Sequence, residues 1–503
     1  GGWAFVLAAS GFVIFALWVA FSRYGRIPLG VDGERPEFRT VSWIAMMFSA
    51  GMGIGLMFFG VAEPLSHFTS PPPGTVAAGS PEALDVAMAT TLFHWTLHPW
   101  AIYAVVGLAI AYSTFRRGRR LLISSAFAPL LGESRTEGAF GKAVDILAIF
   151  ATLFGSAASL GLGALQIGAG LEINGVPELG VGLLVVIIVV LTIAFVASAA
   201  SGVAKGIQWL SNINMVLAGV LAAVVFVAGP TILILNLVPT AIGDYFGNLT
   251  EMAARTAATG GDATAEWLSG WTVFYWAWWI SWTPFVGMFI ARISRGRTIR
   301  QFVVGVLLIP SAVSLLWFAV FGGAAIDLQR SGTDLASLDT EAQLFGLLNS
   351  IPIGGVLAVV AMALVAIFFV SGADAASLVM GTLSQRGTIE PTRWVVVFWG
   401  VVMGAIAAIM LIIGAGGDTA LSGIQTITII MAAPFGLVMV VMCIALAKDL
   451  YDDPLMRRDR RSARAVEQAV DYGTNTYGDA FVVSVKRHPN GAPTAGVEKA
   501  PDT

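Results

Sequence analysis

Five tryptophans lie within one apolar stretch of thirteen residues, between Gly270 and Trp282. On a helix, aromatic residues three and four apart share a face, so this stretch and the turns after it form one stripe. The stripe consists of Trp271, Tyr275, Trp278, Trp282, Phe285 and Phe289, with Trp276 and Trp279 beside it. The electronegative faces of aromatic rings attract cations, quaternary ammonium ions above all. An interfacial belt with bulky core packing is the alternative, and a cluster of this length makes it the weaker interpretation.

A second aromatic group stands in an earlier apolar stretch and comprises Trp95, Trp100 and Tyr103. Pro99 is expected to kink the helix between them. His94 and His98 have the i, i+4 spacing of a helical metal pair. No third ligand lies near them in the sequence, so hydrogen bonding within the helix bundle is the preferred interpretation.

Three closely spaced glycines, Gly51, Gly53 and Gly55, interrupt another apolar stretch. Each glycine costs a helix about 1 kcal/mol relative to alanine. Where such a break lines a cavity, its exposed backbone groups can hold a carboxylate or a small cation. The spacing favours a local unwinding over the alternative, close helix packing through small residues.

Several polar side chains fall at membrane depth, where hydroxyl, amide and carbonyl oxygens suit a hard cation such as sodium. The candidates are Thr152 and Ser156, one turn apart, Asn214, and the segment from Phe368 to Asp374. For any single hydroxyl, a bond back to its own helix is the alternative. Glu63 and Asp374 are intramembrane acids and therefore functional candidates. A structural cap is the preferred role for Glu63, which precedes Pro64 near the end of a span.

These groups must be positioned by membrane helices. The chain of 503 residues is 57% hydrophobic and 12% charged, whereas soluble domains carry about 25% charged residues. Apolar stretches of about 20 residues are too long for barrel strands. The net charge of −3 argues against a nucleic-acid partner. The single cysteine, Cys443, cannot form an intrachain disulfide, and no enzyme motif is found.

Eleven spans are predicted at 3–22, 42–64, 86–114, 143–170, 179–200, 209–238, 268–291, 302–325, 353–383, 394–414 and 422–447. All but two of the Lys and Arg between spans lie in alternate linkers, so these linkers and the C-terminal tail are predicted to be cytoplasmic and residue 1 external. The two exceptions are Arg255 and Arg330. Short helices on the outer rim are expected in 239–267 and 326–352. The tail is expected to be a solvated helix followed by disorder from about Asn475.

Four segments resemble signature sequences of the betaine/choline/carnitine transporter family: GWTVFYWAWW (270–279), GMGIGLMFFGVAEPL (51–65), FHWTLHPWAIY (93–103) and MFIARISRGRTIRQF (288–302). The resemblance extends to about Tyr451. It implies an all-α polytopic membrane protein of the LeuT type with two inverted five-helix repeats, commonly a homotrimer, with eleven of the family's twelve spans present. The implied parts are 1–41 (first span and cytoplasmic linker), 42–238 (first repeat), 239–267 (outer segment), 268–447 (second repeat) and 448–503 (cytoplasmic tail, partly disordered).

The resemblance also implies a role for individual residues. The substrate's ammonium group would lie in a box of Trp95, Trp100, Tyr103 and Trp279, with Trp282 holding it on an inward path lined by Trp278 and Phe274. Its carboxylate would face the backbone of Gly51, Met52, Gly53 and Gly55. One sodium ion would take the carbonyls of Ser49, Met52 and Phe368 with the Ser371 hydroxyl, and a second would take Thr152, Ser156, Asn214 and the Phe285 ring. Gly372 departs from the family, because sodium-coupled members carry a hydroxyl residue there.

The implied function is secondary active import of a zwitterionic osmolyte across the plasma membrane, by sodium symport with alternating access. Glycine betaine is the expected substrate, because the segment from Ser49 to Gly60 is uncharged, whereas choline-type members tend to carry Asp where this chain has Gly55. The alternatives are an uncoupled channel or carrier, proton coupling through Asp374 or Glu63, and transport of choline or ectoine. No organic cofactor is expected, and sodium serves as the coupling ion.

Overall fold

The computed structural model describes residues 2–176, 180–201, 204–414, 420–486 and 494–500, apart from the side chains of 48–51, 200–212, 420, 485–486 and 494–496. The chain divides into two parts, Gly1–Cys443 and Ile444–Thr503. The described residues are mostly helical. All residues discussed as a candidate site belong to the first part.

The first half of the chain runs through α1 (Gly2–Phe21), α2 (Thr40–Gly51), α3 (Ile54–Thr69), α4 (Pro81–Trp95), α5 (Leu97–Ala111), α6 (Ala128–Leu131), α7 (Glu133–Glu137), α8 (Ala139–Ile173), α9 (Val181–Ser201), α10 (Ala204–Ala228) and α11 (Thr231–Ala254). The second half contains α12 (Ala257–Gly270), α13 (Thr272–Ile293), α14 (Ile299–Arg330), α15 (Gln343–Asn349), α16 (Gly354–Ser384), α17 (Arg393–Gly414), α18 (Ala420–Tyr451) and α19 (Pro454–Tyr477). Short helical turns are η1 (Arg23–Arg26), η2 (Tyr112–Arg116), η3 (Ser124–Phe127) and η4 (Leu335–Ser337).

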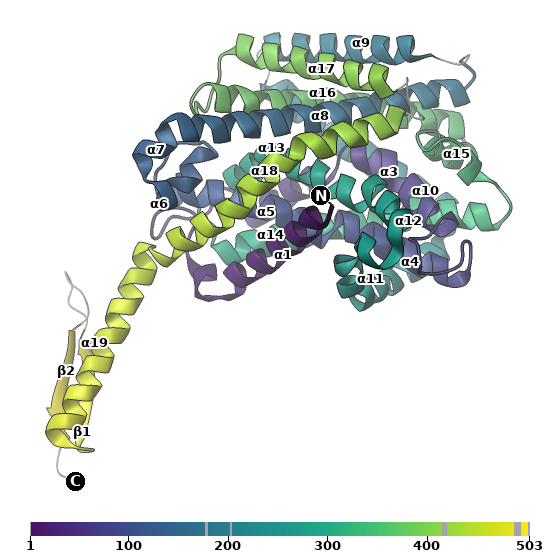
Figure 1. Ribbon diagram of the computed structural model, residues 1–503. Coiled ribbons are helices and arrows are strands. Elements are labelled where there is room, and N and C mark those ends of the chain that lie inside the picture. Colours follow the sequence, from purple (N-terminus) through teal and green to yellow (C-terminus); the bar gives the residue numbers. More distant parts are fainter. Residues whose placement is uncertain (1, 177–179, 202–203, 415–419, 487–493, 501–503) are drawn as a thin grey trace. The chain divides into compact units, whose positions relative to one another are not determined.

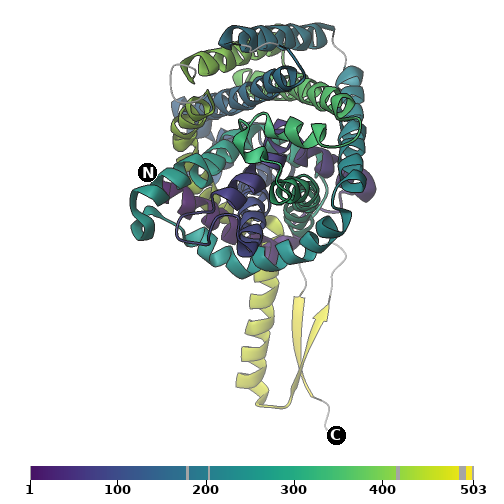
Figure 2. The same ribbon diagram turned by 90° about the vertical axis from the view of Figure 1, so that its right-hand side faces the viewer.

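The long helices of the first part pack in two groups. Helices α8, α9, α16 and α17 contact one another, and Figure 1 shows them running alongside each other. Figure 2 shows from the side that α9 and α17 form the outer pair of this group. The other group contains α3, α4, α5, α13 and α14. Helices at the same position in the two predicted repeats, such as α8 and α16 or α3 and α13, therefore share a group.

Nine helices in the described ranges are long and apolar enough to cross a membrane. Helices α2, α3, α10 and α13, which cover three of the eleven predicted spans, are not among them. Glycines divide the first of these spans, and the four Trp and one Tyr of α13 lower its hydropathy. A further apolar helix, α11, begins at Thr231 inside the predicted span 209–238. It starts there because Pro230 cannot continue a helix from Gly229.

Three linkers that were predicted to lie on one side of the membrane contact each other. Leu29 and residues 296–297 exchange backbone hydrogen bonds of 2.7 and 2.8 Å, and Glu34 pairs with Arg295 at 2.7 Å. Arg116 pairs with Asp32 at 2.6 Å. Linkers 23–41, 115–142 and 292–301 thus lie at the same end of the helices, as the alternating charge pattern requires.

Two helix breaks flank the site. The glycine segment unwinds as predicted: α2 ends at Gly51, α3 begins at Ile54, and Gly53 between them is fully extended. The second break is sharper than the predicted kink, because α4 ends at Trp95 and α5 begins at Leu97. The ring of Pro99 clashes with the carbonyl four residues earlier, which is that of Trp95, so the helix stops at that residue.

The second part forms a small unit of its own. Within it, β1 (Phe481–Lys486) pairs antiparallel with β2 (Thr494–Lys499), with Val483 opposite Val497. The structure thus differs from the expectation of disorder beyond Asn475, because α19 continues to Tyr477 and two strands follow. The aromatic and β-branched residues of 481–485 (FVVSV) favour the strand.

Candidate functional site

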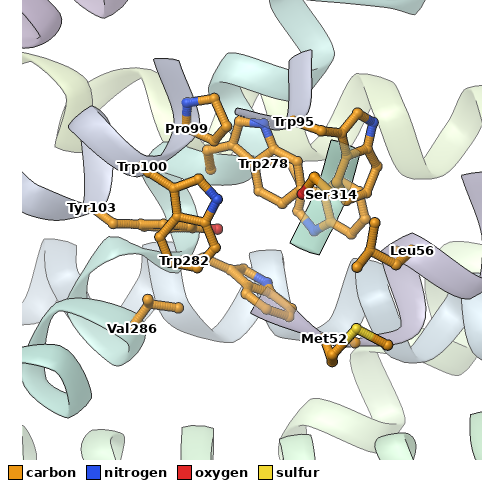
Figure 3. Close-up of a pocket in the computed structure, with 13 residues that line it drawn as sticks. Met52, Leu56, Trp95, Pro99, Trp100, Tyr103, Trp278, Trp282, Val286 and Ser314 are labelled. Atoms are coloured by element: carbon orange, nitrogen blue, oxygen red, sulfur yellow. The ribbon is translucent and has the colours of Figure 1, made fainter. Parts of the chain in front are cut away.

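A small cavity of about 40 Å³ lies between the two helix breaks. All four predicted box residues line it. Figure 3 shows three of them, Trp95, Trp100 and Tyr103, around the cavity together with neighbouring side chains. The ring centroids of Trp95 and Trp279 lie 4.9 Å apart, those of Trp100 and Tyr103 5.2 Å, and those of Tyr103 and Trp279 6.1 Å. The remaining lining residues are Met52, Gly53, Gly55, Leu56, Pro99, Trp278, Trp282, Val286 and Ser314.

Hydrogen bonds fix the indole rings from outside the cavity. Trp279 Nε1 donates to the carbonyl of His94 at 3.0 Å, and Trp278 Nε1 donates to Ser159 Oγ at 3.1 Å. Trp95 Nε1 donates to Glu63 Oε2 at 2.6 Å. With their N–H edges held in this way, the rings can present their faces to a ligand.

The glycine break places backbone groups at the edge of the same cavity. Helix α3 begins at Ile54, so the N–H groups of its first turn have no partner within the helix and carry the positive end of the helix dipole. Gly53 and Gly55 line the cavity beside them. A Cβ at Gly55 would lie 2.8 Å from both Trp95 and Trp278. Only glycine therefore allows the break to approach the rings so closely.

A larger cavity of about 240 Å³ adjoins the first and is lined by residues of both predicted ion sites. The two cavities share Met52, Gly53, Trp282 and Val286, so Trp282 stands where they meet. The large cavity is also lined by Ile54, Ser156, Ser159, Leu160, Asn214, Met215, Phe285, Phe289, Phe368, Ser371, Gly372 and Ala375.

The second predicted ion set is only partly arranged for a cation. Ser156 Oγ and both amide atoms of Asn214 are buried and have no hydrogen-bond partner among the described residues. Phe285 lines the same cavity. Thr152 does not line it, and its hydroxyl donates to the carbonyl of Ala148 at 2.9 Å.

In the first predicted ion set, Met52, Phe368 and Ser371 line one cavity. The Ser371 hydroxyl donates to the carbonyl of Ile367 at 2.8 Å, the bond back to its own helix that was weighed as the alternative. Gly372 faces open space, with no atom within 4 Å of an added Cβ among the described residues. Ser49 and Gly51, which were also predicted to bind ligands, belong to the residues whose side chains the structure does not describe.

Two residues occupy different places from those predicted. Phe274 lies outside the described linings of both cavities and stacks behind Trp278, with centroids 5.5 Å apart. The prediction that Glu63 caps a helix is wrong, because its buried carboxylate bonds to Trp95 and Tyr275 instead. The sequence did hold a signal for this role, because a carboxylate inside a predicted span needs hydrogen-bond partners.

The histidines take part in packing and hydrogen bonds. His98 stacks on Trp276 with centroids 5.2 Å apart, and its Nε2 lies 3.4 Å from Ser10 Oγ. His94 Nδ1 lies 2.6 Å from Glu63 Oε1, and its Nε2 lies 2.9 Å from Thr272 Oγ1. Both histidines therefore hydrogen-bond within the bundle, as the sequence suggested.

Comparison with known proteins identifies the family. A model of the betaine/carnitine/choline family of transporters (BCCT) matches residues 1–455. The chain is 49% identical over 473 residues to the betaine/ectoine transporter LcoP of Corynebacterium glutamicum, a match that covers 93% of this chain and 74% of that one. It is 46% identical over 470 residues to the glycine betaine transporter OpuD of Bacillus subtilis, covering 93% and 89%.

Among solved structures, a Na⁺-coupled sialic acid symporter in a substrate-bound outward-open state aligns with 88% of this chain and 85% of that chain. The TM-score is 0.42 and the identity 14%, which is too low to carry weight. The family match spans most of the chain, and the apolar helices make this a multi-pass membrane protein. The chain belongs to the betaine/carnitine/choline family of transporters.

Proposed function

We propose that this protein imports a zwitterionic quaternary-ammonium osmolyte, with glycine betaine the first candidate, by sodium symport with alternating access. The observation that carries the proposal is the convergence of Trp95, Trp100, Tyr103 and Trp279 on one cavity beside a broken helix. The names of two relatives, a betaine/ectoine transporter and a glycine betaine transporter, agree with this substrate class. Ectoine, a zwitterion with a delocalised cation, is a related candidate.

The two ends of a zwitterion match the two sides of the cavity. The aromatic faces suit the ammonium group, because a desolvated cation–π contact contributes about 2 kcal/mol or more. The N-terminus of α3 suits the carboxylate. No charged side chain lines this cavity in the described part of the chain. A cation such as choline would therefore be bound without a counter-charge, which favours the zwitterion.

Sodium coupling is proposed from the oxygen atoms around the large cavity. Sodium is a hard cation that prefers oxygen ligands, and Ser156 and Asn214 offer buried oxygens that face it without a described partner. Proton coupling is the second candidate. It is favoured by Asp374, a buried acid in α16 whose Oδ2 accepts a hydrogen bond from Ser198 at 3.1 Å.

Alternating access is proposed from the two cavities and the two groups of helices. Trp282 lines both the aromatic cavity and the larger cavity beside it. Movement of the group containing α3 and α13 against the group containing α8 and α16 would open one route and close the other. We place the protein in the plasma membrane as a homotrimer with eleven spans in this chain and a cytoplasmic C-terminus, as the family resemblance and the charge pattern imply.

Competition binding tests the substrate assignment. Purified protein in sodium-containing buffer is loaded with labelled glycine betaine and titrated with unlabelled glycine betaine, ectoine or choline. Glycine betaine should compete at least tenfold more strongly than choline, because choline lacks the carboxylate that α3 would bind. Preferred binding of choline would contradict the zwitterion assignment.

A further inference from the structure

A buried carboxylate stands directly behind the aromatic cavity. Glu63 is fully buried in α3 and does not line the cavity itself. Its Oε2 accepts hydrogen bonds from Trp95 Nε1 at 2.6 Å and from the Tyr275 hydroxyl at 2.5 Å. An oxygen that accepts from two donors suits the ionised carboxylate, whose hydrogen bonds are shorter and about twice as strong as those between neutral groups. Both donors are thus held firmly.

The two donors come from two other helices and meet at one ring of the box. Trp95 ends α4, and Tyr275 lies in α13. Trp95 stands edge-on to Trp279, with an interplanar angle of 74°. Tyr275 stacks on the same ring at 20°, with centroids 5.8 Å apart. One carboxylate therefore fixes two of the rings that contact Trp279 and joins three helices around the cavity.

The other carboxylate oxygen faces two histidines. Oε1 lies 2.6 Å from His94 Nδ1 and 3.4 Å from His67 Nε2. The ligand atoms of these three residues lie within 4.8 Å of one another, which could suit a metal. Two ligands of a tetrahedral zinc ion with bonds of about 2.0 Å are about 3.3 Å apart, however. The shorter separation of Glu63 and His94 is that of a hydrogen bond, so the histidine orients the carboxylate.

We propose that Glu63 is a positioning residue for the substrate's cationic headgroup. It orients Trp95 and Tyr275, and its negative charge polarises the Trp95 indole through the N–H group. Polarisation of this kind strengthens the attraction between the ring face and a cation. The inference rests on the proposed function, because it needs a cationic group in the box. If the carboxylate only held the helices together, its loss would weaken the binding of ligands with charged and uncharged headgroups alike.

The test compares glycine betaine with 3,3-dimethylbutanoate, which has the same shape and carboxylate but an uncharged tert-butyl group. Glu63→Gln keeps the size of the side chain and an acceptor but removes the charge. In this variant the Kd for glycine betaine should rise at least tenfold, while the Kd for the tert-butyl analogue changes less than threefold. Asp145→Asn is the matched control, since Asp145 is a buried carboxylate that accepts hydrogen bonds from Ser124 N and Oγ and does not line the aromatic cavity. It should leave the ratio of the two Kd values unchanged.

An unchanged ratio in Glu63→Gln, or an equal loss for both ligands, would overturn the inference. If the unmodified protein itself fails to prefer glycine betaine to the tert-butyl analogue, the proposed function is wrong instead. Size-exclusion chromatography and thermal unfolding report whether each variant is folded. If Glu63→Gln does not fold, Tyr275→Phe decides, because it removes one donor and leaves Trp95 bonded. It should weaken binding of glycine betaine at least threefold and binding of the tert-butyl analogue less, and wild-type affinity for both ligands would overturn the inference.

Discussion

Three tryptophans of the candidate site have their polar edge and their ring face in different surroundings. The N–H groups of Trp95, Trp278 and Trp279 all bond to atoms outside the cavity. Their faces are left to meet the cavity or to stack on each other, as Trp278 and Trp279 do at 4.8 Å. Replacing one of these tryptophans by Leu or Phe would remove the N–H group, and with it the hydrogen bond that holds the side chain in place.

The first prediction concerns the box. Trp100→Leu or Trp279→Leu should weaken glycine betaine binding about thirtyfold, because a desolvated cation–π contact is worth about 2 kcal/mol. The measurement is the Kd from titration of the purified protein. Trp276→Leu is the control, because Trp276 is equally buried in α13 but packs against His98 outside the cavity. Unchanged affinity in both box variants would refute the assignment.

The second prediction concerns the missing hydroxyl at Gly372. Gly372→Ser adds an oxygen in open space beside Ser371, at the large cavity. One added oxygen ligand contributes about 1 kcal/mol, so the sodium concentration for half-maximal transport should fall about fivefold. Gly355→Ser, on the same helix and also facing open space, is the control and should leave it unchanged. An identical sodium dependence in Gly372→Ser and the unmodified protein would count against this ion site.

The sequence predicted which aromatic residues meet, because spacing on a helix decides which rings share a face. It did not predict the role of Glu63. Whether an acid near the end of a span caps a helix or enters the interior depends on which helices pack around it, and helices α4 and α13 are distant in sequence. The bond of Thr152 back to its own helix is a similar case, since spacing does not show where a hydroxyl points.

At the scale of elements, the site depends on two interruptions that are brought together by packing. The sequence predicted the first interruption, at Met52 and Gly53, because three closely spaced glycines destabilise a helix. Pro99 predicted a disturbance of the second, but its sharpness at Thr96 emerged only in the structure. The start of α11 at Thr231 was missed because the apolar character continues across Gly229 and Pro230.

The third prediction uses the contrast between two glycines of the break. Gly55→Ala should weaken glycine betaine binding about tenfold, because its Cβ would press on Trp95 and Trp278 and overpacking costs about 1–3 kcal/mol. Gly53→Ala should stay within about threefold of the unmodified protein, since its Cβ meets no atom within 4 Å and its backbone is extended. Titration of both variants measures the difference. Equal effects would show that ring contact at Gly55 does not govern the site.

At the scale of the whole molecule, the charge pattern and the contacts between linkers agree. The positively charged linkers that follow α1, α5 and α13 contact each other through Leu29, Asp32 and Glu34. Hydropathy predicted most of the helices. It could not settle the number that cross a membrane, because α13 combines low hydropathy with a central position in the fold.

The central claim is that a sodium gradient drives uptake of a zwitterion through the aromatic cavity. The most direct measurement is uptake of labelled glycine betaine by proteoliposomes under an inward sodium gradient, with potassium replacing sodium in matched vesicles. The account predicts accumulation above the external concentration with sodium, saturation with increasing sodium, and near-background uptake with potassium at any pH gradient. Full uptake in potassium that follows an imposed pH gradient, or equilibration without accumulation, would contradict it.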